Sequence, residues 1–222
     1  MSSYPPPFHK EDISTLLHFA AQSGSTELVR LLISRGADVG ATVICGERAR
    51  VQRFIQRNDA QVAPGRCGAT PLRSAATRGH AEVARLLIKA GADIEAMSDG
   101  DVTPLHEAAF EGHTAVARLL FAAGVNVSPV DVAGATALHL AVLKGHEEMA
   151  RLLIDNSGDL SPVDQALRTP LHEAARLGHD VVARMLVEGG ANVLAVDRAG
   201  RTPRDLALMN GHKTLAQRLG GH

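Results

Sequence analysis

The sequence has few of the features that mark a secreted or membrane-spanning protein. It contains two cysteines in 222 residues, too few for a disulfide scaffold, which favours a reducing compartment. Its apolar runs fall short of the roughly 18 residues that a membrane helix needs. The opening MSSYPPPFHKEDIS lacks the apolar core of a secretory signal. From these absences we expect an intracellular protein, in the cytoplasm or the nucleus, without a membrane segment.

A strong charge of either sign is also missing. Lysine and arginine number 23 against 24 aspartates and glutamates, and the formal net charge is -1. Such a chain makes no overall field that gathers nucleic acid or anionic lipid. Any charge-driven partner must therefore bind a local patch. Hydrophobic residues make up 45% of the chain, which is enough to bury a core.

Recognisable catalytic motifs are absent from the sequence as well. It has no nucleophile elbow, no phosphate-binding loop and no metal-ligand spacing. We therefore expect no cofactor and no metal, and a protein that is not an enzyme.

What the sequence does contain is an internal repeat. Similar segments of the type TPLHEAAFEGHTAVARLL recur every 33 residues, beginning at Thr70, Thr103, Thr136, Thr169 and Thr202. A degenerate copy, TLLHFAAQSGSTELVRLL, begins at Thr15, which is 55 residues before Thr70, or one period of 33 plus 22. The extra length predicts an insertion, which we place at about 42–68.

Each copy predicts two short helices. Thr103 can cap the first helix, Pro104 suits its first turn, and Gly112 can supply the left-handed conformation that ends it. Apolar residues then recur at helical spacing before a glycine turns the chain into a hairpin-like loop. One unit cannot bury its apolar face alone, so stacked units should form a solenoid. Leu167 stands where Gly134 and Gly200 turn their loops, which leaves the conformation of its loop open.

The combination of TPLHxAA, GH, LL and GAD at a period of 33 resembles the ankyrin repeat family. The resemblance covers residues 13–222 apart from the insertion, with six copies. It implies an all-α fold, a solenoid of stacked antiparallel helix pairs with projecting hairpin loops, which binds partners through its concave face and loop tips. We expect one such domain at 13–222, a disordered segment at 1–12, and a monomer.

Nine of the eleven histidines occupy two repeat positions. Metal ligands lie about 2 Å from one ion, whereas neighbouring helices lie roughly 8 to 10 Å apart, so equivalent histidines cannot converge on one metal. We expect these rings to form hydrogen bonds with helix ends and loops. They are His18, His106, His139 and His172 in the TPLH position, and His80, His113, His146, His179 and His212 after the glycine.

The positions that vary between copies are candidates for specificity. By the resemblance they face the concave side, where an apolar centre with a charged rim favours a protein partner. The residues expected to bind it are Thr77, Arg78, Glu107, Phe110, Glu111, Leu140, Leu143, Lys144, Glu173, Arg176 and Leu177. The alternative is that these are ordinary solvated positions. At the loop tips, Arg168, Arg198 and Arg201 form a basic cluster that suits an acidic partner.

A second hypothesis is a small-molecule binder or an unusual enzyme that uses the concave groove, closed by the insertion. Glu107, Glu111 or Glu173 would then accept a proton. However, Glu107 and Glu173 occupy the same position two copies apart, so their helices should lie on the order of 16 to 20 Å apart. Paired catalytic carboxylates of glycosidases lie about 5 to 9.5 Å apart.

The insertion at about 42–68 is basic, with five arginines against two acidic residues. Arg50, Arg53, Phe54 and Arg57 lie in a stretch that favours a short amphipathic helix. It is a tolerated surface excursion, a functional finger that contacts a ligand, or an error in the gene model. Nucleic-acid binding is disfavoured because only one aromatic residue accompanies the arginines.

Overall fold

The computed structural model describes residues 10–42, 69–157 and 159–221. Within these ranges there are twelve α-helices and no β-strand, so the all-α prediction is confirmed. Most of the basic insertion, including Arg50, Arg53, Phe54 and Arg57, lies outside the described residues. Residues 1–9 of the predicted disordered segment lie outside them too, and the first helix begins at Lys10, three residues before the predicted boundary at 13.

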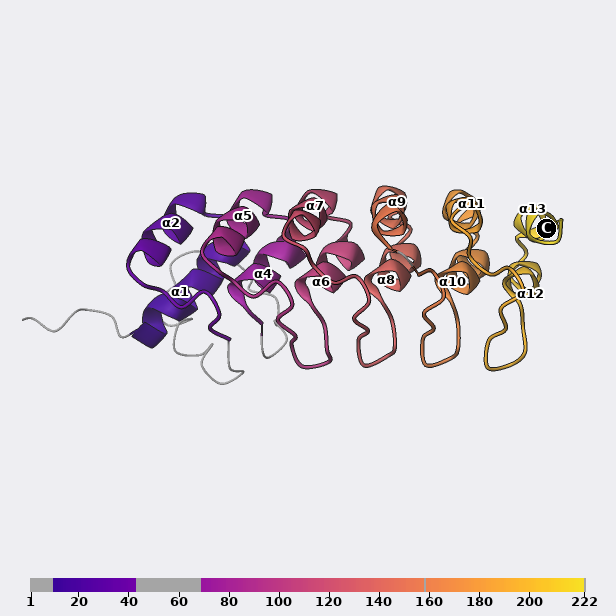
Figure 1. The fold of residues 1–222 in the computed structure, drawn as a ribbon, viewed down its shortest axis with the longest axis horizontal. Coiled ribbons are helices and arrows are strands. Elements are labelled where there is room, and N and C mark those ends of the chain that lie inside the picture. Colours follow the sequence, from indigo (N-terminus) through magenta and orange to yellow (C-terminus); the bar gives the residue numbers. More distant parts are fainter. Residues whose placement is uncertain (1–9, 43–68, 158, 222) are drawn as a thin grey trace, which may run out of the picture.

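The helices form pairs that stack side by side, with one row of first helices and one row of second helices (Figure 1). Long loops project on the side of the first row. The first and second helices of successive pairs are α1 (Lys10–Ser23) and α2 (Thr26–Ser34), α4 (Pro71–Arg78) and α5 (Ala81–Lys89), α6 (Pro104–Glu111) and α7 (Thr114–Ala122), α8 (Ala137–Lys144) and α9 (Glu147–Asn156), α10 (Pro170–Leu177) and α11 (Asp180–Glu188), and α12 (Pro203–Met209) and α13 (Lys213–Leu219).

Each first helix from α4 onwards begins as the sequence predicts. The hydroxyl oxygen of Thr103 accepts a hydrogen bond from the backbone N–H of His106, which satisfies one of the free donors at the start of α6. Gly112 ends the helix in the left-handed conformation, with φ of 76°. The same start and the same kind of end recur in α4, α8 and α10.

The first pair departs from this pattern. Thr15, where the repeat register predicts a helix start, lies inside α1, which begins five residues earlier at Lys10. Proline disfavours helical geometry in the residue before it, and so fixes the start of a helix where TP occurs. Leu16 follows Thr15 in place of proline, which permits the longer helix, but α8 also lacks the proline and still begins after Thr136, so the missing proline alone does not determine the start.

One continuous core runs along the stack, because every pair buries alanines and leucines against its neighbours. Ala108 and Ala109 of α6 are completely buried, and their small size lets neighbouring helices approach closely. None of the helices in the part of the chain that the structure describes is both long and apolar enough to cross a membrane.

The projecting loops are joined to one another by backbone hydrogen bonds. The N–H of Val132 donates to the carbonyl of Gly100 at 3.1 Å, and the equivalent bond in the next loop runs from Gln165 to Ala133 at 2.9 Å. Leu167 has a φ of 57°, close to the values at the equivalent Gly134 and Gly200. The loops that contain Gly134, Leu167 and Gly200 therefore share the left-handed residue at this position, whether or not it is glycine.

Candidate partner-binding face

A threonine and a histidine at the start of the first helix connect each pair to the next. In α6, the N–H of Thr103 donates to Nδ1 of His106 at 3.2 Å, so Nε2 carries the proton and donates to the carbonyl of Ala135 at 3.2 Å. His139 and His172 make the same two bonds. Burial lowers the pKa of all three rings below the ordinary value of 6.5. The predicted structural role of these histidines is confirmed.

The second set of histidines packs against glycines of the preceding pair. Nε2 of His113 lies 3.3 Å from the carbonyl oxygen of Thr77, and Nε2 of His146 lies 3.1 Å from that of Phe110. A Cβ atom on Gly79 would lie 2.6 Å from the ring of His113, so the ring fills space that only glycine leaves. Among the residues that the structure describes, no three His, Cys, Asp or Glu side chains gather as metal ligands would.

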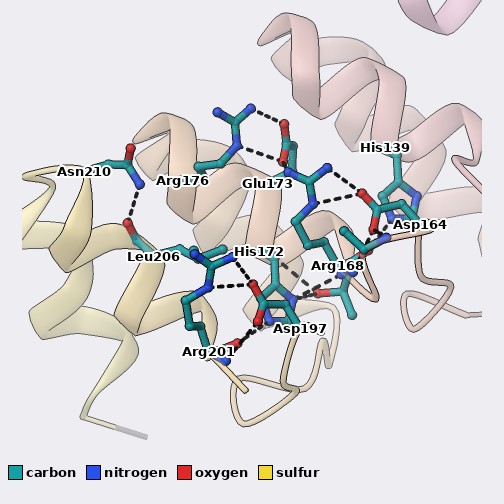
Figure 2. A network of polar contacts seen from close by, with 12 residues as sticks. His139, Asp164, Arg168, His172, Glu173, Arg176, Asp197, Arg201, Leu206 and Asn210 are labelled. Atoms are coloured by element: carbon teal, nitrogen blue, oxygen red, sulfur yellow. Dashed lines mark hydrogen bonds and ion pairs between the residues drawn. The ribbon is translucent and has the colours of Figure 1, made fainter. Parts of the chain in front are cut away.

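Glu173, which the sequence offers as a charged contact or a proton acceptor, is only 7% exposed. Nη1 of Arg168 lies 3.2 Å from its Oε2, and Arg176 contacts both of its carboxylate oxygens (Figure 2). Glu173 is therefore buried and paired, not solvated on the charged rim of the predicted face. The carboxylate is held by two guanidinium groups and stabilises the junction between α10 and the preceding loop.

Glu107 is engaged in a similar way. Its Oε1 lies 3.2 Å from Nε of Arg73, and the two side chains are 11% and 5% exposed. Arg73 occupies the position that histidine has in other copies, so this ion pair joins α4 to α6 where other junctions use an imidazole. Of the three carboxylates considered as proton acceptors, only Glu111 is exposed.

The apolar centre of the predicted face lies between α6 and α8. Nζ of Lys144 lies 4.1 Å from the centre of the Phe110 ring, a cation–π contact that joins the two helices. Phe110 is half-buried, and Leu143 beside Lys144 is 41% exposed. The aromatic ring and the ammonium group therefore share one patch, and the exposed Leu143 is the neighbour of Lys144 in the sequence.

The other predicted contacts surround this patch with different degrees of exposure. Leu140, Leu177 and Thr77 are half-buried, whereas Arg78 is exposed. The hydroxyl of Thr77 donates to the carbonyl of Arg73 at 2.9 Å, which commits it to its own helix.

Comparison with family models matches almost the whole repeat region. A model of three ankyrin repeats matches residues 41–131, 97–164 and 128–197, and a model of the single ankyrin repeat matches residues 13–42. The chain belongs to the ankyrin-repeat family.

Two curated relatives match part of this ankyrin chain. The E3 ubiquitin-protein ligase XBAT33 of Arabidopsis thaliana is 34% identical over 88 residues, which is 34% of this chain and 17% of the ligase. Protein phosphatase 1 regulatory subunit 27 of Homo sapiens is 37% identical over 87 residues, 39% of this chain and 42% of the subunit. The matches therefore cover less than half of either relative.

The predicted basic cluster of the ankyrin loops is largely neutralised by the loops themselves. Nη2 of Arg168 lies 2.7 Å from Asp164, and Nη2 of Arg201 lies 2.7 Å from Asp197 (Figure 2). The hydrogen bond from the Arg201 side chain lowers the pKa of Asp197 to about 2. Arg198 is exposed. The cluster is corrected to two internal ion pairs and one exposed arginine.

One feature of the ankyrin loops escaped the sequence interpretation. Four exposed apolar side chains occupy the same place in successive loops. Each lies six residues before the threonine that caps the next first helix. We call them the loop column: Met97, Val130, Val163 and Val196. The signal for them in the sequence is the 33-residue spacing of these apolar residues.

Proposed function

We propose that this chain is a protein-interaction module of the scaffold, adaptor or regulatory kind, without enzymatic activity of its own. Its partner is a protein that binds across α6, α8 and α10 and the adjacent loop tips. The observation that carries the proposal is the cation–π contact between half-buried Phe110 and exposed Lys144, on a row of first helices whose Glu107 and Glu173 are already paired. Aromatic residues such as Phe110 are enriched at protein interfaces.

The packing of the stack supports this choice of face. First helices of neighbouring pairs contact one another more extensively than second helices do. Closer packing on one side of a stack places that side on the inside of the curve. The row that carries Phe110, Leu140 and Leu143 is therefore the row that can wrap around a partner.

The repeat count and the insertion complete the proposal. Six helix pairs occur among the described residues, and we assign each to one 33-residue repeat, with the basic segment at about 42–68 inserted between the first two. The cytoplasm or nucleus suits a chain with two cysteines. We also propose that the module is a monomer and binds no nucleic acid.

The alternative, a small-molecule binder or enzyme in the concave groove, has less support. Glu107 and Glu173, two of its three candidate proton acceptors, are held in ion pairs with arginines. A cavity of about 500 Å³ does exist, but it lies between α11 and α13 in the other row, lined by residues such as Val187, Leu215 and Leu219.

Affinity capture from native extract tests the proposed face. The double substitution Phe110→Arg and Leu143→Glu should abolish recovery of the specific partner, because it places two charges in the contact. A matched control is Leu28→Arg with Leu31→Glu on α2, which changes two exposed leucines in the same way and should leave recovery unchanged. Circular dichroism checks that both variants fold. Equal recovery by the folded Phe110 and Leu143 variant would refute the proposed face, and a deletion of residues 42–63 shows separately whether the insertion contributes.

A further inference from the structure

Exposed apolar residues on this protein are concentrated in the projecting loops. Of the twelve large hydrophobic side chains that are exposed among the described residues, seven lie in these loops: Met97, Val130, Val132, Val163, Leu167, Leu194 and Val196. Four of the seven form the loop column, with exposed fractions of 41% to 55%. Scattered exposed leucines and valines need no explanation, but an aligned series of them marks an interaction site.

The loop column is held in register by the hydrogen bonds between loops. Val132, Gln165 and Arg198 each lie two residues after a member of the column, and the N–H of each donates to a carbonyl of the preceding loop at 2.9 to 3.1 Å. Gly134 also lies close to the next loop, because a Cβ there would lie 3.2 Å from the backbone of Asp164. The loops therefore cannot move independently. Since neighbouring helices pack about 8 to 10 Å apart, the four apolar side chains should follow at about that spacing.

The formal charge of the loops differs between the two ends of the same edge. The first loop, residues 90–102, has four acidic residues and no basic one, namely Asp93, Glu95, Asp99 and Asp101. The loops at 123–135 and 157–168 each have a formal charge of -1, and the loop at 189–201 has +1. Arg168 and Arg201 are paired within their own loops, so the exposed basic group at the last loop is Arg198. A ligand that lies along the loop column meets acidic residues at Met97 and a basic residue at Val196.

We propose that the loop column binds an amphipathic α-helix of a partner protein, with its basic, N-terminal end over Met97 and its acidic, C-terminal end over Val196. Seven helical residues rise about 10.5 Å, close to the spacing of the loops, so one apolar side chain per heptad can contact each loop. The positive end of the helix dipole favours the acidic loop, which fixes the direction. This inference rests on the proposed function, because it names the kind of partner that the module would bind at its loop tips.

Other extended ligands fit the loop column less well. In a β-strand, three residues span about 10 Å, which matches the spacing of the loops. Successive side chains of a strand point to opposite faces, however, so residues three apart cannot all face the loop column. A polyproline II helix advances about 9.3 Å in three residues, but its recognition uses grooves lined with aromatic side chains. The four loops contain no aromatic residue. The aliphatic side chains of the loop column therefore suit contact with a row of aliphatic side chains on one face of an α-helix.

A synthetic peptide tests the proposal directly. The probe is a fluorescein-labelled helical peptide with four leucines at intervals of seven residues, lysines in its N-terminal half and glutamates in its C-terminal half. Fluorescence anisotropy should show saturable binding to the full chain. The substitutions Val130→Ser and Val163→Ser should weaken binding about tenfold, because they remove the two central apolar contacts. The matched control, Leu28→Ser with Leu31→Ser, should bind as the original chain does. A peptide with the two charged halves exchanged should bind about fivefold more weakly.

Three results would overturn the proposal. The first is that the helical probe shows no saturable binding. The second is that a proline-rich peptide with leucine at every third residue binds as tightly as the probe or more tightly. The third is that the original chain self-associates in sedimentation experiments and that the Val130 and Val163 variant does not. The last would make a second copy of this chain the occupant. The Phe110→Arg and Leu143→Glu variant separates the two proposals. This variant should still bind the probe. If the original chain does not bind the probe, but the Phe110 and Leu143 variant still loses the partner captured from extract, the proposed function stands without the loop column.

Discussion

At the scale of single residues, Leu167 shows how strongly the stack imposes its backbone geometry. It adopts a φ of 57° in a turn where the equivalent residues Gly134 and Gly200 have 76° and 74°. For an L-residue with a side chain, this left-handed conformation costs roughly 1 to 2 kcal/mol. Its side chain is 45% exposed, so burial does little to offset the cost. The hydrogen bonds of the loop hold the residue there: the N–H of Leu167 donates to the carbonyl of Asp164 at 2.9 Å.

We expect Leu167→Gly to stabilise the protein by about 0.5 to 1 kcal/mol, because relief of the backbone strain exceeds the entropy that glycine adds to the unfolded chain. Urea unfolding followed by circular dichroism measures the effect. The reciprocal change, Gly200→Ala, has open space for a Cβ and should destabilise by about 1 kcal/mol from backbone strain alone. A lower midpoint for Leu167→Gly would contradict this account.

At the scale of the elements, a glycine and a histidine act as one joint between neighbouring pairs. Gly79 ends α4 with a φ of 73°, and the ring of His113 occupies the place of its missing side chain. The two residues are 34 positions apart in the sequence, yet the His113 ring leaves no space for a side chain at residue 79.

A double-mutant cycle should reveal this coupling. Gly79→Ala should destabilise by about 1 kcal/mol through backbone strain and by about 1 to 3 kcal/mol more through the clash with His113. In a His113→Ala background the second part should disappear, so the two changes should not be additive. Gly91→Ala is the control, because Gly91 has a φ of 86° but nothing within 4 Å of a Cβ. Additive effects of Gly79→Ala and His113→Ala would show that the contact carries no energy.

The elements also show where sequence reasoning reaches its limit. The threonine, proline and glycine positions predicted the boundaries of α6 and α10 because capping and left-handed ends are local effects. The helix start that the repeat register predicts at Thr15 lies five residues after the start of α1, whereas α8, which also lacks proline, begins in register. The roles of Glu107 and Glu173 were missed for another reason. Glu107 pairs with Arg73 of a neighbouring helix, so that contact depends on packing between copies. Arg168 and Arg176, the partners of Glu173, lie within five residues of it in the sequence, but the repeat pattern does not show that they fold onto its carboxylate.

At the scale of the whole molecule, buried histidines make the stability of the stack depend on pH. The folded-state pKa values of His106, His139 and His172 are lowered by burial below about 6.5, the value expected in the unfolded chain. The unfolded chain therefore binds protons first as the pH falls. The stability that these rings contribute is fully present above pH 6.5 and is lost as the pH falls below it.

We expect the midpoint of urea unfolding to be lower at pH 5.5 than at pH 7.5, with most of the change below about pH 6.5. Asp197, with a pKa of about 2, stays ionised over this range and does not contribute. In His106→Gln the overall stability should fall, but the dependence on pH should weaken, because an amide does not titrate. A midpoint that stays constant or rises on acidification would contradict the prediction.

The sequence by itself determined the unit, the family and the structural role of the histidines, because helix capping, glycine conformation and a 33-residue period are written in neighbouring residues. Only the tertiary structure decided which charges remain available to a partner. It pairs Glu107 and Glu173 with arginines and closes two loop arginines onto their own aspartates, while it brings Phe110 to Lys144 and aligns the loop column. The physical reason is that a repeat period fixes where residues recur along the chain, whereas side-chain pairing depends on how each loop folds and on how the copies stack.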